Sequence, residues 1–220
     1  MKVVLFGATG MLGQGVLREC LLAPDVESVL AIGRSATGVK HPKFREIVHA
    51  DMWHYDAIAG QLRGLDACFF CLGVTSAGMS EADYSRVTYD ITMAAAETLC
   101  RLNPDMTFVF VSGAGADSTE QGRLMWARVK GKTENAIFRL PFKASFAFRP
   151  GAVQPLHGER SRTAAYRVLY AITKPLLPLL RRVAPGQILT TEQFGHAMLH
   201  VVRQGAPKRV LESADINGLS

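Results

Sequence analysis

The sequence is poor in cysteine, in clustered charge and in uninterrupted apolar stretches, and each scarcity excludes a class of protein. Four cysteines in 220 residues are too few for a disulfide framework, so we expect reduced thiols. The apolar segment 163–180 is interrupted by Arg167, Lys174 and two prolines, so it lacks the ~18 uncharged residues of a membrane-spanning helix. Lysine and arginine are scattered, without a run interleaved with aromatics, so a nucleic-acid groove is not favoured.

A secretory signal is also missing from the printed sequence. Met1 and Lys2 pass directly into the strand-like run Val3–Phe6, which leaves no room for a charged region, an apolar region and a cleavage site. We therefore expect a cytoplasmic protein. The formal charge of +6 favours an anionic partner, and a phosphate-rich cofactor meets that preference as well as a nucleic acid does.

Neither of two spaced pairs of metal-binding residue types predicts a metal site. Cys68 and Cys71 fall in an apolar run, where residues three apart point to opposite faces of a strand, so core packing is the favoured interpretation. His196 and His200 lie one helical turn apart, but no third ligand accompanies them. We expect no metal. Nucleophile-elbow and P-loop motifs are missing as well, so hydrolase and P-loop functions have no support.

Apolar runs rich in Val, Ile, Phe and Ala alternate with helix-period segments through the first two thirds of the chain. This order is typical of βαβ units, and it predicts one α/β domain over residues 1–220 with a Rossmann-type, doubly wound parallel sheet. Strands are expected near residues 2–6, 28–32, 44–48, 66–71, 106–112 and 144–149. Helices are expected near residues 11–22, 55–62, 80–102 and 121–138.

The pattern loosens from Pro150 onward, where prolines become frequent. Helical stretches are predicted near 161–182 and 190–204, and residues 150–220 are expected to form a small cap region over the carboxyl edge of the sheet. The basic, apolar segment 161–182 is interpreted as a substrate-side cap or as a subunit contact in a homodimer. Contact with a membrane surface or a partner protein is a less favoured alternative.

A glycine-rich turn follows the first predicted strand and opens the first helix. Gly7 permits the sharp turn, Gly10 lets a pyrophosphate approach the backbone, and Gly13 allows close packing of helix and strand. The helix N-terminus adds free N–H groups and a partial positive charge. The predicted pyrophosphate site comprises Gly7, Thr9, Gly10, Met11, Leu12 and Gly13.

The end of the second predicted strand indicates which dinucleotide is bound. A protein that selects NAD presents Asp or Glu about 20 residues after the glycine turn, to hold the ribose 2′-hydroxyl. Here Arg34 and Ser35 occupy this place, so a guanidinium and a hydroxyl are available for a 2′-phosphate. NADP is the predicted cofactor and NAD is less favoured. An ordinary surface arginine is the competing interpretation.

Two later strand ends are expected to complete the cofactor pocket, because ligands of open α/β sheets lie across the carboxyl ends of the strands. Asp51 follows the third strand and could contact the adenine. Leu72 and Gly73 follow the fourth strand and could border the adenosine ribose and the pyrophosphate. A solvated aspartate and a simple turn glycine are equally favoured alternatives.

These motifs together resemble the atypical short-chain dehydrogenase/reductase superfamily, and are most similar to its compact Tat-interacting-protein-like branch, over nearly the whole chain. The motifs are Gly7-x-x-Gly10-x-x-Gly13, Arg34, Asp51, Cys71-Leu72-Gly73, Val111-Ser112-Gly113, Lys130-Gly131 and Arg149-Pro150-Gly151. The resemblance implies that Ser112 is the catalytic serine and Lys130 the catalytic lysine, which also clamps the nicotinamide ribose. It further implies that Pro150 and Gly151 border the cofactor.

The chain departs from this pattern at the catalytic tyrosine, where Trp126 stands. A phenol can be tuned into a general acid or base, whereas an indole N–H only donates a hydrogen bond. Tyr84 or Tyr89 could supply a substitute phenol. Two functions therefore stay open: an NADP-dependent oxidoreductase acting on a small carbonyl or alcohol compound, and a dinucleotide-binding regulator or scaffold without turnover. A nucleotide-sugar epimerase or dehydratase is the least favoured.

Overall fold

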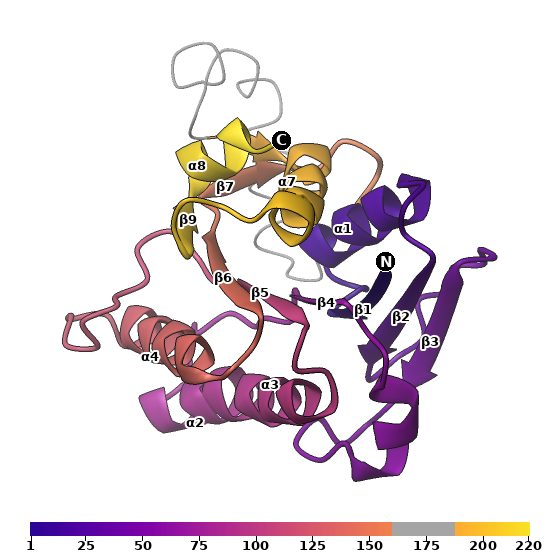
Figure 1. Ribbon diagram of the computed structural model, residues 1–220. Helices are drawn as coiled ribbons and strands as arrows, with labels where there is room; N and C mark the ends of the chain where they lie inside the picture. The colour runs from indigo at the N-terminus through magenta and orange to yellow at the C-terminus, as the bar shows by residue number, and fades with distance from the viewer. Residues whose placement is uncertain (160–187) are drawn as a thin grey trace.

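A seven-stranded, wholly parallel sheet forms the centre of the computed structural model, which describes residues 1–159 and 188–220 (Figure 1). The strand order is β3-β2-β1-β4-β5-β6-β9, which reverses direction beside β1 as in a doubly wound fold. The strands are β1 (Lys2–Phe6), β2 (Ser28–Gly33), β3 (Phe44–Val48), β4 (Ala67–Phe70), β5 (Thr107–Val111), β6 (Ala144–Arg149) and β9 (Val210–Glu212). The predicted fold class is confirmed.

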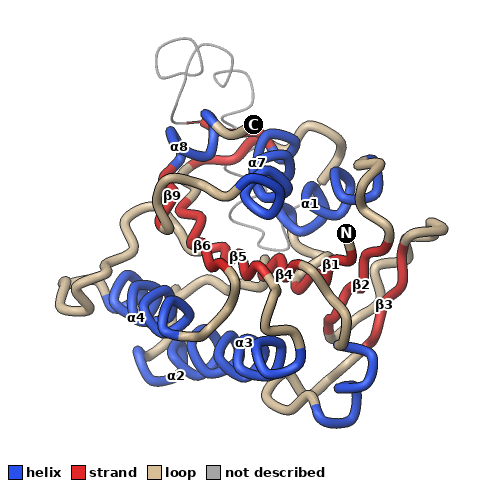
Figure 2. Tube along the Cα trace, viewed as in Figure 1, coloured by secondary structure: helices blue, strands red, loops and turns tan. Residues whose placement is uncertain are grey.

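Helices cover both faces of this sheet (Figure 2). One face packs against α1 (Met11–Leu22), α7 (Thr191–Gln204) and α8 (Ser213–Gly218). The other face packs against a 3-10 helix η1 (Asp56–Leu62), α3 (Ile91–Leu102) and α4 (Met125–Arg139). Because the central strands β4 and β5 are buried along their whole length, their side chains are apolar on both faces.

The six expected strands and the expected helices of the first 150 residues are all present, with small changes of boundary. The helix expected over 80–102 is divided into α2 (Glu81–Ser85), a π-helical turn η2 (Arg86–Asp90) and α3. The helix expected over 121–138 begins later, at Met125. None of the described helices combines the length and apolar character needed to cross a bilayer.

Part of the region 150–220 belongs to the main fold. Strand β9 pairs with β6 at the sheet edge, and α7, which matches the helix expected over 190–204, packs on α1. A small second sheet joins β7 (Ala152–Gln154) to β8 (Ile188–Thr190). Strands of three residues carry no readable periodicity, so β7, β8 and β9 were missed. The helix expected over 161–182 lies outside the described residues.

Candidate functional site

The glycine turn after β1 has the geometry that its spacing predicts. Gly7 adopts a φ of +80°, and a Cβ there would lie 2.6 Å from the carbonyl oxygen of Cys71. A Cβ on Gly13 would lie 2.0 Å from the carbonyl oxygen of Gly7, so helix α1 can approach the turn only with glycine at that position. The turn is closed by a hydrogen bond from Gly10 N–H to Gly7 O of 2.9 Å. Larger residues are therefore excluded here by sterics.

The N-terminus of α1 carries the positive end of the helix dipole. Gly10 is the N-cap residue, with an extended backbone and no side-chain cap, and the first helical turn contains no acidic residue. Backbone N–H groups of a helix's first turn have no partner within the helix, so an anion is the natural partner at this end. Met11 and Leu12, the first two residues of α1, line a neighbouring pocket.

This pocket, of about 620 Å³, lies along the carboxyl ends of the central strands. It joins the start of α1 to the segments that follow β4, β5 and β6 and to the start of α4. Residues with a predicted role that line it are Gly10, Met11, Leu12, Leu72, Gly73, Ser112, Trp126, Lys130, Pro150 and Gly151. The structure therefore brings Gly10, Met11 and Leu12 of the predicted pyrophosphate site around one space with the predicted catalytic residues, whereas Gly7, Thr9 and Gly13 do not line it.

Ser112 directly follows β5 and has a buried hydroxyl. Its backbone N–H donates to Phe148 O at 2.7 Å, which fixes the residue against β6. Within residues 1–159 and 188–220, the Oγ of Ser112 has no hydrogen-bond partner. A buried hydroxyl without a partner carries a free-energy penalty of about 1–3 kcal/mol, which a ligand oxygen in the pocket would relieve.

Lys130 lies on α4 and is buried near Ser112, which follows β5. Its Nζ donates to Val111 O at 3.1 Å and lies 4.9 Å from the centroid of the Phe110 ring. Burial lowers the pKa of this lysine to about 8, and the nearby Glu134 carboxylate partly opposes that shift. The ammonium is therefore held near its titration point at the edge of the pocket.

The carboxylate of Glu134 is itself occupied. Glu134 is fully buried and accepts hydrogen bonds from Nε and Nη2 of Arg149, at the end of β6. Arg149 Nη2 also donates to Ser118 Oγ at 2.6 Å. Because the guanidinium satisfies the carboxylate, Lys130 shares its pocket with no free anion among the described lining residues.

Trp126 stands four residues before Lys130 on the same face of α4 and lines the pocket. Its ring packs against the loop after β5, since a Cβ on Gly115 would lie 3.5 Å from Trp126 Cη2. The two candidate phenols differ in position. Tyr84 is buried and lines the pocket, whereas Tyr89 is not among the lining residues and holds its ring 4.6 Å from Lys132 Nζ.

A second, narrower pocket lies beside the ends of β1 and β2, and is named the adenosine-end pocket after the ligand predicted there. The predicted residues lining it are Gly7, Thr9, Arg34, Ser35 and Leu72. Arg34 is exposed and forms no ion pair within the described part of the chain. Its guanidinium is therefore available to an anionic ligand.

Glu46, which no sequence pattern singled out, lines the same adenosine-end pocket. Glu46 Oε2 accepts hydrogen bonds from Thr37 N–H and Thr37 Oγ1, both at 2.8 Å. The carboxylate thereby ties the loop after β2, which carries Arg34, to β3. Its place within a strand, rather than at a strand end, gave no signal of this contact.

Asp51 is not brought to either pocket by the structure. Its carboxylate is exposed and accepts hydrogen bonds from His54 Nδ1 at 2.8 Å and from Trp53 N–H at 3.0 Å. The hydrogen bond from His54 is the main cause that lowers the pKa of this carboxyl group. Asp51 therefore organises its own turn, and its predicted contact with adenine stays a prediction.

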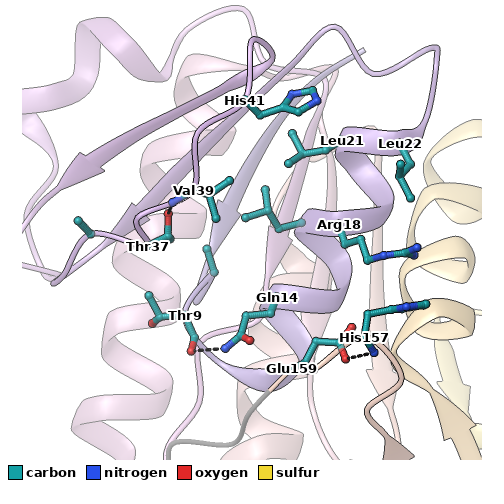
Figure 3. Close-up of a pocket in the computed structure, with 14 residues that line it drawn as sticks. Thr9, Gln14, Arg18, Leu21, Leu22, Thr37, Val39, His41, His157 and Glu159 are labelled. Carbon is teal, nitrogen blue, oxygen red and sulfur yellow. Dashed lines mark hydrogen bonds between the residues drawn. The ribbon is translucent and has the colours of Figure 1, made fainter.

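A third cavity, of about 670 Å³, lies on the outer side of α1 (Figure 3). Apolar side chains of α1 face the loop 36–41 across it, and His157 and Glu159 border its lower end. Gln14 spans part of it, with Nε2 donating to Thr9 O at 2.9 Å.

Among the described residues, no group of three or more His, Cys, Asp or Glu side chains could hold a metal ion.

Curated relatives of this chain are fungal proteins that share one name. The chain is 30% identical over 168 residues to "Protein FMP52, mitochondrial" of Eremothecium gossypii, covering 73% of this chain and 68% of that protein. The chain belongs to the FMP52 family. Another member, "Protein FMP52-2, mitochondrial" of Scheffersomyces stipitis, is 26% identical over 218 residues, which cover 94% of this chain and 90% of the relative. No protein-family model matches the sequence.

The expectation of a cytoplasmic protein is wrong. It rested on the missing secretory pattern, which bears only on export and not on the other compartments of a cell. The FMP52 proteins of Meyerozyma guilliermondii, Scheffersomyces stipitis and Saccharomyces cerevisiae are all named as mitochondrial. The family names therefore point to mitochondria.

Solved structures with the same fold include UDP-sugar 4-epimerases, short-chain dehydrogenases/reductases and an NAD⁺ complex of the enzyme WbmF. The enzyme WbmF of Bordetella bronchiseptica, in complex with NAD⁺, superposes on this FMP52-family chain with a TM-score of 0.69 at 16% identity, covering 99% of this chain and 76% of that chain. A short-chain dehydrogenase/reductase of Saccharomyces cerevisiae gives a TM-score of 0.63 at 15% identity, covering 99% and 98% of the two chains. These likenesses establish a Rossmann-type fold for this chain.

Proposed function

We propose that the chain binds a nicotinamide dinucleotide, with the pyrophosphate on the N-terminus of α1. One observation carries this proposal: the acid-free N-terminus of α1 opens into the pocket that also holds buried Lys130 and the Ser112 hydroxyl, which has no hydrogen-bond partner among the described residues. Phosphate oxygens would satisfy the helix N–H groups. The fold shared with NAD-bound WbmF supports the same interpretation.

The preferred nucleotide under this proposal is NADP(H). Arg34 is exposed at the adenosine-end pocket, beside Ser35, and a guanidinium binds a 2′-phosphate through two hydrogen bonds. Glu46 lines the same pocket, but both hydrogen bonds from Thr37 hold its Oε2. NAD is the less favoured nucleotide.

The proposed activity is that of an oxidoreductase on a small carbonyl or alcohol compound. The bound dinucleotide would supply or accept a hydride. In this arrangement the Ser112 hydroxyl holds the substrate oxygen, and the Lys130 ammonium hydrogen-bonds the nicotinamide ribose. The closer similarity to the Tat-interacting-protein-like branch and a homodimeric state stay predictions. The names of the relatives support a mitochondrial setting.

The second candidate function is a dinucleotide-binding regulator or scaffold without turnover. One observation favours it, namely that Trp126 lines the pocket at the position expected for the proton-transferring tyrosine. An indole N–H cannot exchange a proton with a substrate at neutral pH. Binding without turnover would then be the whole function of the site.

Calorimetric titration with NADP and NAD tests both the site and its selectivity. We expect Arg34→Asp to weaken NADP binding by roughly 10- to 100-fold, since a charge-assisted hydrogen bond contributes about 1.5–3 kcal/mol, and to change NAD binding much less. Arg63→Asp is the matched control, because Arg63 is exposed and lines neither nucleotide pocket.

Two outcomes would contradict the proposal at different levels. Equal weakening of both nucleotides in Arg34→Asp would remove the assignment of the 2′-phosphate to this guanidinium. No heat of association with either nucleotide, on folded protein, would refute dinucleotide binding itself.

A further inference from the structure

We propose that the phenol of Tyr84 replaces the missing tyrosine as the proton donor of this site, a role that rests on the proposed reduction of a carbonyl compound. Tyr84 lines the same pocket as Ser112, Trp126 and Lys130. Only 3% of Tyr84 is exposed, so the residue belongs to the interior of the site and not to its rim. It reaches the pocket from α2 rather than from α4.

The chemical step balances with a reduced nicotinamide dinucleotide as the reductant. The carbonyl carbon accepts a hydride from the dinucleotide and forms a new C–H bond, so the carbonyl is reduced and the dinucleotide oxidised. The carbonyl oxygen takes the proton of Tyr84 as the phenolic O–H bond breaks. A proton from the solvent then restores the phenol, so each reduction consumes one proton as well as one hydride. Ser112 holds the same oxygen by its hydroxyl, and Trp126 is needed for neither transfer.

A bidentate ion pair docks α2 on α4 and sets the position of Tyr84. Arg128 Nε donates to Glu81 Oε1 at 3.1 Å, and Arg128 Nη2 donates to Glu81 Oε2 at 2.6 Å. Glu81 and Tyr84 are three residues apart, so they lie on one side of the short helix. Arg128 stands between Trp126 and Lys130 on α4. The ion pair therefore connects α2, which carries Tyr84, to α4, which carries Lys130.

The π-helical turn after α2 supplies an independent indication. In an uninterrupted α-helix, Tyr84 would lie on nearly the same side as Ile91, seven residues later, and Ile91 packs into the core. The wider turn Arg86–Asp90 changes this register, and Tyr84 belongs to neither of the two described core clusters. Single π turns inside helices occur frequently at functional sites. The turn separates a pocket-facing helix from a core-facing one.

Tyr89 provides a matched control within the same helical stretch. It is also a phenol, but its ring lies against Lys132 and is not among the lining residues of the pocket. The test compares Tyr84→Phe with Tyr89→Phe by NADPH oxidation over a panel of carbonyl compounds and by calorimetric NADP binding. Trp126→Tyr is included as a variant that restores a phenol four residues before Lys130.

We expect Tyr84→Phe to lower kcat by roughly 100- to 10,000-fold, the usual contribution of a general acid, while the Kd for NADP is unchanged. Tyr89→Phe should change neither quantity. In Tyr84→Phe, the added Trp126→Tyr substitution should return part of the lost kcat. Glu81→Gln should lower kcat without weakening NADP binding, and it serves as the second variant if Tyr84→Phe does not fold.

Three outcomes overturn the assignment and leave nucleotide binding intact. The first is a normal kcat in Tyr84→Phe, and the second is an equal loss of kcat in Tyr89→Phe. The third is a wild-type protein that binds NADP without turnover, whether or not the Trp126→Tyr variant is active. A wild type that binds neither NADP nor NAD refutes the proposed function instead, so the two failures are distinguishable.

Discussion

Lys130 places an ionisable group where the protein interior disfavours its charge. Burial lowers the pKa of its ammonium from an ordinary value near 10.5 to about 8. The hydrogen bond to Val111 O and the contact with the Phe110 ring offset only part of that cost. A lysine retained in a buried pocket at this cost is typical of a functional position.

The shifted pKa of Lys130 predicts how stability changes with pH. Between pH 8 and pH 10.5 the folded protein has lost this proton while the unfolded chain still binds it, so the free energy of unfolding rises with pH. Below pH 8 the group contributes no slope. We expect Lys130→Met to be more stable than the wild type at pH 7, and the difference to shrink as pH rises above 8.

Urea unfolding at several pH values measures this difference. Lys132→Met is the control, because it removes an exposed lysine only two residues further along α4. A constant gap between Lys130→Met and the wild type from pH 7 to pH 10 would show that Lys130 is not desolvated in the folded protein.

At the scale of elements, the position of α1 depends on a close approach to α7. A Cβ on Gly15 would lie 2.7 Å from Thr191 Cβ and 3.1 Å from Thr191 O, and a Cβ on Gly195 would lie 2.6 Å from Glu19 Cγ. The two glycines let the helices pack with their backbones near one another. Because α1 begins at the proposed pyrophosphate site, this contact also fixes the direction of its N-terminus.

Gly15→Ala should therefore cost stability although alanine favours helix formation. We expect a loss of about 1–3 kcal/mol in the free energy of unfolding, the usual result of overpacking, and weaker binding of NADP through a displaced α1. Gly60→Ala is the matched control, since a Cβ there meets nothing within 4 Å. Unchanged stability in Gly15→Ala would mean that α1 and α7 separate without cost.

The elements that the sequence predicts are those with long, continuous apolar runs. Strands β4 and β5 are buried on both faces, so composition alone marks them. The π turn Arg86–Asp90 leaves no trace in a helical pattern, and three-residue strands are too short to show alternation. Local pattern therefore gives the main α/β frame and misses the features that modify it.

The same difference between local pattern and long-range packing decides which site residues could be predicted. The glycine turn could be predicted from sequence because its shape depends mainly on residues close together in the chain, namely Gly7, Gly10 and Gly13. Tyr84 and Glu46 reach their pockets through packing between elements distant in sequence, so spacing alone offered at most a list of candidates. Asp51 shows the opposite case, in which a strand-end carboxylate binds its own turn.

On the scale of the whole molecule, the chain has a formal charge of +6. The ion pairs among the described residues do not include Arg34, which lines the adenosine-end pocket. A ligand that supplies three phosphoryl groups meets both the net charge and this local one. Its contacts would join β1, β2, α1 and the segments after β4 to β6, which lie along one edge of the sheet.

Binding across so many elements should stabilise the folded protein as a whole. At an NADP concentration 100-fold above its Kd, the free energy of unfolding should rise by about 2.7 kcal/mol, which for a chain of this length raises Tm by roughly 5–10 °C. Differential scanning calorimetry of the wild type and Arg34→Asp at one fixed NADP concentration checks this. In the variant, a Kd raised 10- to 100-fold should reduce the increase to about 0.4–1.4 kcal/mol. The smaller increase given by NAD should persist, because only the 2′-phosphate distinguishes the two nucleotides. An undiminished NADP effect in Arg34→Asp would assign the 2′-phosphate to another cation.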